Sequence, residues 1–239
     1  MGQLRRHRFH LRELNAGVIT VSGYEAQHLS RVLRVKPGDS VLAFDGEGRE
    51  ASGQVTAVDE DGVIVTLDEP QPSEVEPDLQ VTVAVALLKG DKLSDVVRRC
   101  TELGAVRFQP VLTKQADVPH LSPNKLARLQ RVAREAAKQS GRSVIPEVAP
   151  AIPLSELEWS GTAVLAHLRA SEPLASALPD LPDGAELTLI TGPEGGFAAE
   201  EAQALVDRGA TPVYLGKRIL RAETAPVALM SAILLPEAR

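Results

Sequence analysis

The sequence has little of several residue types, and each shortage limits what the chain can be. A single cysteine, Cys100, occurs in 239 residues, which excludes a disulfide framework and a cysteine-based zinc site. Aromatic residues make up only 3% of the chain, so its cores have to be built from Val, Leu, Ile and Ala. The longest apolar run, Val81–Leu88 with one threonine, is far too short to cross a bilayer. We expect Cys100 to fill a core.

Targeting and metal-binding signals are missing as well. The N-terminus is basic but has no apolar stretch of the kind that a signal peptide requires. We find no cluster of side chains with metal-ligand spacing and expect no metal. The single cysteine suits a reducing compartment, so the sequence predicts a cytoplasmic protein with no membrane partner.

Basic residues are fewer than acidic ones, 26 against 32, and they are unevenly distributed along the chain. The net charge of −6 argues against nucleic-acid binding if it is taken alone. However, residues 1–36 contain seven Lys and Arg against two acids, and residues 121–142 contain six against one. Residues 59–78 contain eight acids and no base. This segregation permits a basic face on an acidic protein.

The pattern along the chain predicts two domains. Between Ser40 and Leu67, short β segments alternate with turn signals, which is typical of a small antiparallel barrel. We place this domain at residues 1–70. The Pro-rich, acidic residues 71–78 are the predicted linker to a second domain, residues 79–239. The expected β segments and the two hairpin signals between them are Val41–Phe44, Val55–Val58, Val63–Leu67, Asp45–Gly48 and Asp59–Gly62.

Strands and helices alternate in the second domain, which predicts an α/β layer architecture. Helical spacing begins at Leu93 and ends before Gly104, and Ser122 with Pro123 is a helix start. That helix extends to about Ser140. The further expected elements are strands at Val81–Leu88, Val106–Leu112, Ala163–Ala166, Leu187–Ile190 and Val213–Leu215, and helices at Ala198–Arg208 and Thr224–Leu234.

Two segments near the C-terminus are candidates for a ligand site. Thr191–Phe197 and Leu215–Ala225 each follow an apolar run and precede a helical pattern. We therefore predict two strand-to-helix turns at one end of a sheet, where α/β proteins bind ligands. Glu200 and Glu201 in the next helix disfavour a phosphate and favour a neutral or cationic ligand.

The motifs Gly192-Pro-Glu-Gly-Gly196 and Leu220-Arg-Ala-Glu-Thr-Ala225 resemble those of the knotted SPOUT methyltransferases. The resemblance is to the bacterial 16S ribosomal RNA (uracil-N3)-methyltransferases, and it extends over nearly the whole chain. Arg99 and Lys114–Asp117 depart from that family's usual residues. The resemblance implies an α/β fold with a PUA-like β-barrel followed by a SPOUT domain with a trefoil knot. It also implies a homodimer.

The same resemblance implies methyl transfer from S-adenosylmethionine to N3 of a uridine in small-subunit ribosomal RNA. Arg221 and Arg8 are the candidate catalytic residues, because a cation can stabilise the charge that develops on the uracil. We find no convincing general base. The residues implied for the cofactor are Leu165, His167, Thr191, Gly192, Pro193, Glu194, Gly195, Gly196, Leu215, Gly216, Ile219, Leu220, Arg221, Thr224 and Ala225.

Two basic regions are candidates for contact with RNA. Cations on the helix that begins at Ser122 could equally form an ordinary solvated face, and we favour RNA contact modestly. The predicted RNA-binding residues are Arg8, His28, Arg31, Arg34, Arg131, Arg134, Lys138 and Arg142. Two alternatives stay open: a SPOUT enzyme acting on another RNA such as transfer RNA, and a non-catalytic RNA-binding or ribosome-assembly factor.

Overall fold

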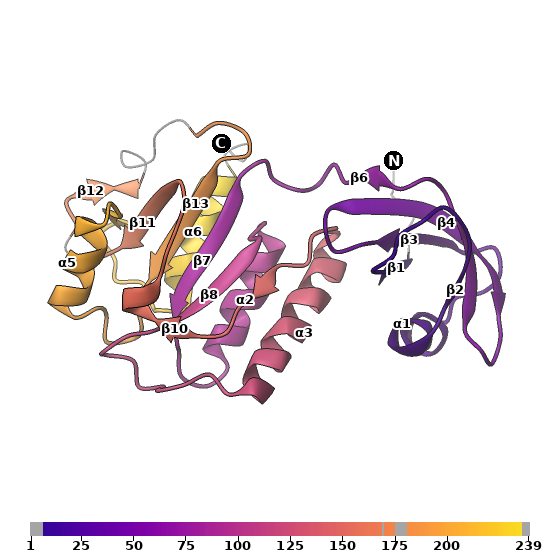
Figure 1. Cartoon of the computed structure of the whole chain (residues 1–239), viewed down its shortest axis with the longest axis horizontal. Coiled ribbons are helices and arrows are strands. Elements are labelled where there is room, and N and C mark those ends of the chain that lie inside the picture. Colours follow the sequence, from indigo (N-terminus) through magenta and orange to yellow (C-terminus); the bar gives the residue numbers. More distant parts are fainter. Residues whose placement is uncertain (1–6, 169, 175–180, 236–239) are drawn as a thin grey trace. The chain divides into compact units, whose positions relative to one another are not determined.

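The computed structural model describes residues 7–168, 170–174 and 181–235, which form two compact units (Figure 1). The first unit consists of Met1–Glu76 and Ala137–Ile145, and the second of Pro77–Ala136 and Pro146–Arg239. The division after Glu76 lies inside the predicted linker, residues 71–78. The sequence pattern gives no indication that Ala137–Ile145 belongs with the N-terminal residues.

The first unit is built on a mostly antiparallel sheet. Both predicted hairpins are present, since β3 pairs with β4 and β4 pairs with β5 in antiparallel fashion. In the second hairpin, the side-chain oxygen Oδ1 of Asp59 accepts the backbone N–H groups of Asp61 and Gly62. The strands are β1 (His7–His10), β2 (Gly17–Val21), β3 (Ser40–Phe44), β4 (Arg49–Val58), β5 (Val63–Leu67) and β6 (Gln71–Pro72).

The pairing of these strands leaves the sheet open, whereas the sequence pattern predicts a small antiparallel barrel. The strand order is β1-β3-β4-β5-β2, with β6 beside β4, and β1 runs parallel to β3. Within the described part of the chain, β1 and β2 at the two ends of this order do not pair. Ala26 and Leu29, which come from a helical segment after β2, instead pack into the same core as Phe9 and Val21. The helical segment therefore covers core residues that would be covered by pairing of β1 with β2 if the sheet were closed.

That helical segment changes its geometry along its length. Helix α1 (Gly23–Gln27) continues directly into the π-helical turn η1 (His28–Leu33). The next residue, Arg34, has a φ of 55°, and it is the single non-glycine residue with positive φ among those described. Such backbone conformations are uncommon for residues with a side chain.

The second unit contains an all-parallel eight-stranded sheet. Its order is β10-β8-β7-β13-β11-β14-β12, with β9 paired to β8. All five predicted strands of this domain are present, within one or two residues at each end. The strands are β7 (Gln80–Ala86), β8 (Arg107–Leu112), β9 (Glu147–Val148), β10 (Ile152–Pro153), β11 (Thr162–Ala166), β12 (Glu172–Pro173), β13 (Glu186–Thr191) and β14 (Thr211–Tyr214).

Helices cover this sheet on both faces, because alternate residues of each strand point to opposite sides. Val81, Val83 and Val85 of β7 face a core shared with α2, α3 and α6, whereas Ala84 and Ala86 face a core shared with α5. Cys100 is fully buried in the first of these cores, as predicted, and burial raises the pKa of its thiol to about 12. The helices are α2 (Lys92–Glu102), α3 (Pro123–Ser140), η2 (Leu154–Glu156, a 3-10 helix), α5 (Ala199–Asp207) and α6 (Thr224–Leu234).

The predicted helix boundaries are confirmed by the local contacts. The hydroxyl oxygen of Ser122 accepts the backbone N–H of Lys125 at 3.3 Å, and α3 starts at Pro123. Helix α2 ends just before Gly104, which has a φ of 113°. No helix in the described ranges is both long enough and apolar enough to cross a membrane.

Candidate cofactor site and basic surfaces

The two predicted turns lie at the same edge of the parallel sheet. Strand β11 pairs with β13 on one side and with β14 on the other, always in parallel, so the carboxyl ends of all three strands meet at one edge. The first turn, Gly192–Phe197, follows β13 and leads to α5. The second, Leu215–Glu223, follows β14 and leads to α6. Residues from all three segments can therefore contact one ligand.

The structure thus brings the residues implied for the cofactor to one sheet edge, although their side chains differ in accessibility. Leu165 on β11 is fully buried in the core that α5 covers. His167 directly follows β11, and its backbone N–H donates to Val213 at 2.9 Å. Thr191, at the end of β13, is also buried, and its hydroxyl has no hydrogen-bond partner among the described residues. Ile219 on the second turn is 81% exposed.

Two glycines of these turns are required for different reasons. At Gly195, an added Cβ would lie 3.3 Å from both Cβ and the backbone oxygen of Gln115, so the turn and Gln115 are in close contact. With its amide oriented so that donors meet acceptors, Gln115 donates from its side-chain nitrogen to the carbonyls of Gly195 and Gly196. At Gly216, the space around an added Cβ is open, but φ is 85°. Gly195 is therefore constrained by packing within the protein, and Gly216 by its backbone conformation.

Lys92 links the two turns. Its ammonium group lies 2.8 Å from Oε1 of Glu194 in the first turn and 3.7 Å from Oε2 of Glu223 at the end of the second. Glu194 also accepts the backbone N–H of Lys89 at 3.4 Å. A single cation at the start of α2 therefore connects the loops that follow β13 and β14.

The protonation of this pair follows from its contacts. Burial acts to raise the pKa of Glu194, but hydrogen bonds from Lys92 and from the backbone outweigh it and the pKa is lowered. Hydrogen bonding to Glu194 raises the pKa of Lys92. Both groups are therefore charged at neutral pH, and the link between the turns is ionic.

The start of α5 already has an acid against its free N–H groups. The carboxylate of Glu201 accepts the backbone N–H of Ala198 at 3.0 Å and that of Lys114 at 2.8 Å. Glu200 pairs with the ammonium group of Lys114 at 2.7 Å. Because an anion would have to compete with these carboxylates, the helix start is a poor phosphate site.

Arg221 points away from the protein interior. Its side chain is 83% exposed, and Glu223 is 3.9 Å away, at the outer limit of an ion pair. A guanidinium with so weak an internal contact is available to an external anion. The predicted catalytic residue is therefore accessible at the edge where the two turns meet.

Two of the predicted RNA contacts are buried in the first unit. The Lys138 side chain is 3% exposed and pairs with Glu25 at 2.6 Å. The Arg142 side chain is 4% exposed and lies 2.6 Å from Glu76. The other oxygen of Glu76 accepts the backbone N–H groups of Ser143 and Val144. Both cations therefore attach the segment Ala137–Ile145 to the rest of the first unit.

Arg8 is held in the same way. Its Nη2 donates to the backbone oxygen of Arg142 at 2.9 Å and to the hydroxyl of Ser143 at 3.1 Å. Its Nη1 lies 3.4 Å from Glu50. Burial lowers the pKa of the Arg8 guanidinium, and the Glu50 carboxylate opposes this effect. Arg8 thus contributes to the attachment of Ala137–Ile145.

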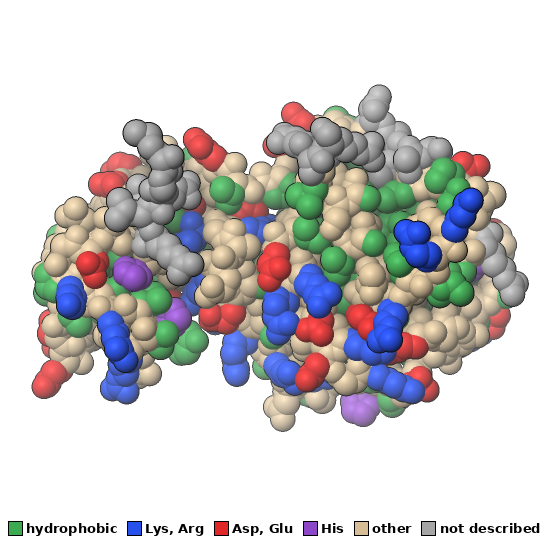
Figure 2. All heavy atoms as spheres, turned by 180° about the vertical axis from the view of Figure 1, so that it is seen from behind, with side chains coloured by type: hydrophobic (Ala, Val, Ile, Leu, Met, Phe, Trp, Pro, Cys, Tyr) green, Lys and Arg blue, Asp and Glu red, His purple; other side chains and the backbone are tan. Residues whose placement is uncertain are grey.

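The remaining predicted RNA residues are more accessible. Arg31, Arg34, Arg131 and Arg134 are exposed, and His28 is half-buried. Elsewhere on the second unit, some exposed cations have acidic neighbours, as in the pairs Arg98–Asp95 and Arg128–Asp91. Figure 2 shows this mixture of basic and acidic side chains on the larger unit. Among the described residues, Arg131 and Arg134 form no such ion pair.

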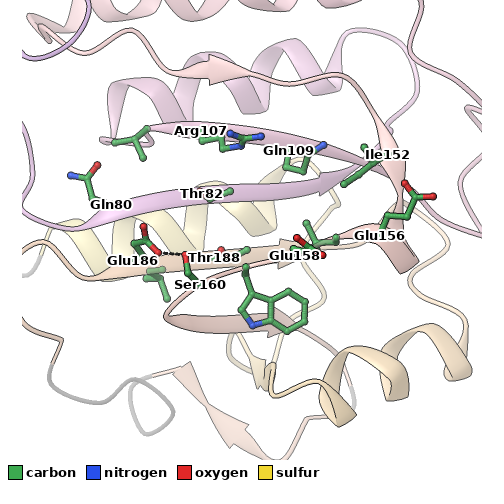
Figure 3. A pocket seen from close by; sticks show the side chains of 14 residues that line it. Gln80, Thr82, Arg107, Gln109, Ile152, Glu156, Glu158, Ser160, Glu186 and Thr188 are labelled. Atoms are coloured by element: carbon green, nitrogen blue, oxygen red, sulfur yellow. Dashed lines mark hydrogen bonds between the residues drawn. The ribbon is translucent and has the colours of Figure 1, made fainter.

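A polar hollow lies elsewhere on the sheet of the second unit. Its volume is about 490 Å³, and it is lined by the first halves of β7, β8 and β13 and by residues 156–160. Figure 3 shows Thr82, Gln109 and Thr188 along its sheet wall. Ligands of α/β sheets bind at the carboxyl ends of the strands, whereas these are the amino-terminal halves. We therefore place the candidate cofactor site at the two turns and not in this hollow.

Sequence reasoning misses two residues that shape the candidate site, Lys92 and Gln115. One feature of the sequence could have pointed to Lys92: the segment Lys89–Lys92 is similar to the corresponding segment of the uracil-N3 methyltransferase family that the chain resembles. Gln115 lies in a segment that departs from that family. Both residues act on turns that lie about 80 to 130 positions further along the chain, so periodicity cannot reveal their contacts.

Two family models match the chain. A model described as RNA methyltransferase domain matches residues 75–234, and a model described as RNA methyltransferase PUA domain matches residues 21–68. The first match includes both turns and Lys92. In the described residues there is no group of three or more His, Cys, Asp or Glu side chains that could hold a metal ion.

Relatives match over most of the chain. A ribosomal RNA small subunit methyltransferase E from Synechocystis sp. is 38% identical over 90% of this chain and 72% of the relative. The ribosomal RNA small subunit methyltransferase E from Bacillus subtilis is 31% identical over 91% of this chain and 90% of the relative. The crystal structure of a ribosomal RNA small subunit methyltransferase E from Neisseria gonorrhoeae, bound to S-adenosyl methionine, is 30% identical, with a TM-score of 0.86 and 96% and 97% of the two chains covered. The chain therefore belongs to the ribosomal RNA small subunit methyltransferase E family of RNA methyltransferases.

Proposed function

We propose that this protein methylates N3 of a uridine in small-subunit ribosomal RNA and that S-adenosylmethionine is the methyl donor. One observation carries the proposal: the two turns after β13 and β14 flank the end of β11 at one sheet edge. The solved relative with this fold is bound to S-adenosyl methionine. The relatives are named for ribosomal RNA of the small subunit, and the uracil N3 position follows from the family that the sequence resembles.

The residues at this edge fit the cofactor. The buried hydroxyl of Thr191 lacks a partner among the described residues, and a polar ligand would supply one. The exposed side chain of Ile219 would be covered by an apolar part of the ligand. The acids Glu194, Glu200 and Glu201 favour a cationic ligand over a phosphate. When bound, the cofactor supplies an electrophilic methyl group on a sulfonium cation.

The remaining residues of the two turns would complete the cofactor pocket. His167 lies on its rim after β11, and the backbone of Leu165 lies at the end of that strand. The turn residues proposed to contact the cofactor are Gly192, Pro193, Gly195, Gly196, Leu215, Gly216, Leu220, Thr224 and Ala225.

Arg221 is the proposed catalytic residue. N3 of uracil is a weakly acidic imide that must lose its proton, here to hydroxide from the solvent, before it can attack a methyl group. The negative charge then spreads over O2 and O4, and a cation placed beside these atoms stabilises it by roughly 3–4 kcal/mol. Arg221 is exposed and weakly paired, so it can take this role. Arg8 is the second candidate, but its contacts with Glu50, Ser143 and Arg142 favour a role in holding the first unit together.

The finer features of the fold are part of the same proposal. We propose that the second unit has the SPOUT trefoil knot. We also propose that the first unit is a PUA-like β-barrel in which the helical segment Gly23–Leu33 covers the gap between β1 and β2. We also propose a symmetric homodimer. The exposed apolar side chain of Leu168, on the loop after β11, is consistent with a partner that completes the site.

A transfer assay tests the proposal. The protein is incubated with methyl-labelled S-adenosylmethionine and with 16S ribosomal RNA, assembled small subunits or transfer RNA, and the labelled nucleotide is then mapped. We expect label at N3 of one uridine in the small-subunit RNA. Label in transfer RNA would favour a related enzyme with another substrate. Calorimetry that detects no binding of S-adenosylmethionine would favour a non-catalytic assembly factor.

A further inference from the structure

The helical segment Gly23–Leu33 presents an aromatic side chain to solvent in a chain that has few. Tyr24 is 60% exposed and Val32 is 66% exposed. The other face of the segment is anchored, because Ala26 and Leu29 are buried in the core of the first unit. The exposed side chains stand on a turn that changes from α- to π-helical geometry, and such turns are frequent at functional sites.

The Tyr24 ring is held in place by two neighbours. The His28 ring lies nearly parallel to it, with 6.3 Å between the ring centroids and 20° between the planes. The ammonium group of Lys138 lies 5.5 Å from the centre of the Tyr24 ring. Lys138 is itself fixed by Glu25 at 2.6 Å. Ordering a side chain in advance reduces the entropy that a ligand must pay on binding.

The charge beside this pair of rings is positive. Arg31 and Arg34 are exposed and have no ion pair among the described residues, and Lys36 is exposed two positions further on. Glu25, the one acid of the segment Gly23–Lys36, is neutralised by Lys138. The surface therefore combines an exposed aromatic side chain with cations that have no ion pair among the described residues, which is the composition of sites that bind single-stranded nucleic acid.

We propose that Tyr24, stacked against His28, is a platform for an unpaired base of the RNA substrate, with Arg31 and Arg34 contacting neighbouring phosphates. This inference rests on the proposed function. N3 of uracil lies on the edge used in base pairing, so the target region must be unpaired when it reacts, and neighbouring bases then expose their faces. Aromatic side chains stack on such bases with little dependence on sequence.

Affinity measured at several salt concentrations tests the platform. The probe is a 16S ribosomal RNA transcript, and the variants are Tyr24→Ala, Tyr24→Trp and Val18→Ala in the full chain. We expect Tyr24→Ala to weaken RNA binding about tenfold with an unchanged salt slope, because stacking releases no counterions. We expect Tyr24→Trp to bind the transcript with the affinity of the unaltered protein, because tryptophan keeps an aromatic face for stacking. Val18, which is 73% exposed on β2, is the matched control, and its replacement leaves binding unchanged.

A fluorescent reporter separates stacking from an indirect loss of structure. The chain has one tryptophan, Trp159, in the second unit. A Trp159→Phe, Tyr24→Trp double variant therefore carries a single tryptophan at the platform. We expect the transcript to quench its fluorescence, and we expect Tyr24→Ala to bind S-adenosylmethionine with normal affinity. Normal RNA affinity of Tyr24→Ala, or no quenching, would overturn the platform.

The outcomes also distinguish this inference from the proposed function. If the unaltered protein transfers no methyl group to small-subunit RNA, the proposed function fails. If transfer is normal in the unaltered protein and in Tyr24→Ala alike, the platform alone fails. A defect of Tyr24→Ala with assembled subunits but not with the bare transcript would mean that the surface docks on a ribosomal protein, which also overturns the inference.

Discussion

The cations predicted to contact RNA fall into two groups with opposite surroundings. The buried group, defined as Lys138, Arg142 and the partly buried Arg8, is bound to carboxylates or backbone oxygens inside the first unit. The exposed group is defined as Arg31, Arg34, Arg131 and Arg134, and none of its members has an ion pair among the described residues. The basic run on α3 is divided between the groups, because Arg131 and Arg134 belong to one and Lys138 to the other.

The difference shows why a count of basic residues overstates a binding surface. A buried cation is expensive to desolvate, so it occurs with carboxylates that accept its hydrogen bonds. Those carboxylates are remote in sequence: Glu76 precedes Arg142 by 66 positions, and Glu25 precedes Lys138 by 113. Glu76 also belongs to the acidic stretch whose composition predicted only a linker. Its charge serves to hold the segment Ala137–Ile145.

The largest effect is expected from the buried group. Arg142→Met leaves the carboxylate of Glu76 with two backbone donors but without its cation, and we expect it to lower the free energy of unfolding by about 3–5 kcal/mol. Denaturant unfolding of the full chain measures this. Arg128→Met removes an exposed cation paired with Asp91 and is the matched control, with an expected change below about 1 kcal/mol.

The alternative for Arg142 is a direct RNA contact, which the same variant can reveal. Arg142→Met with unaltered unfolding and a reduced salt dependence of RNA binding would transfer Arg142 to the exposed group. The buried group would then consist of Arg8 and Lys138 only.

The sequence was sufficient to predict most elements and the position of the two turns at one sheet edge. The strands of the second unit are apolar runs bounded by turn residues, and Ser122, Pro123 and Gly104 act locally on helix ends. The two glycine-containing turns could be placed together because parallel strands share an edge. Such features depend on neighbours in sequence or on one simple rule of topology.

Contacts between distant segments could not be predicted. The open sheet of the first unit depends on Leu29 packing beside Phe9, and the link between the turns depends on Lys92 reaching Glu194 and Glu223. None of these pairs shares a periodicity or a spacing signal. The same limit explains why Lys138 and Arg142 are indistinguishable in sequence from the exposed arginines.

A second prediction concerns Arg221, an exposed cation outside both groups. Arg221→Ala is expected to lower the single-turnover methylation rate about one hundredfold at saturating RNA, because the developing charge on uracil loses its cation. Affinity for S-adenosylmethionine is expected to change little. A normal single-turnover rate combined with weak RNA binding would assign Arg221 to docking, together with the exposed group.

Lys92 provides an intermediate case, since it is half-exposed and has two acidic neighbours. We expect Lys92→Met to weaken S-adenosylmethionine binding about tenfold, because the turns lose their ionic link and like charges remain. Calorimetry measures this, and Lys89→Met, which removes an exposed pair with Asp117, is the control. Equal affinities of the two variants would contradict the role of Lys92.

Because the pair contains the carboxylate of Glu194, the effect of Lys92→Met on cofactor affinity is expected to depend on pH. The pKa of Glu194 is lowered in the folded protein, so its contribution is present above the ordinary carboxylate pKa. That contribution is lost as the pH falls through the lowered value. We therefore expect Lys92→Met to weaken S-adenosylmethionine binding at neutral pH. In solution acidic enough to protonate Glu194, we expect the variant and the unaltered protein to bind the cofactor with equal affinity.

The smallest effect is expected for Arg131 and Arg134, the two members of the exposed group that lie on α3. Replacing either residue by Gln is expected to reduce the slope of log K for RNA against log salt by about 0.7–0.9, since one phosphate contact is lost. Stability is expected to change by less than about 0.5 kcal/mol, because neither side chain is buried or paired within the described chain. Arg98→Gln removes an exposed cation that already has Asp95 beside it, so its salt slope is expected to stay unchanged. Identical slopes for all three variants would mean that the lack of an acidic partner does not identify the cations that meet RNA, and the RNA would then have to bind elsewhere.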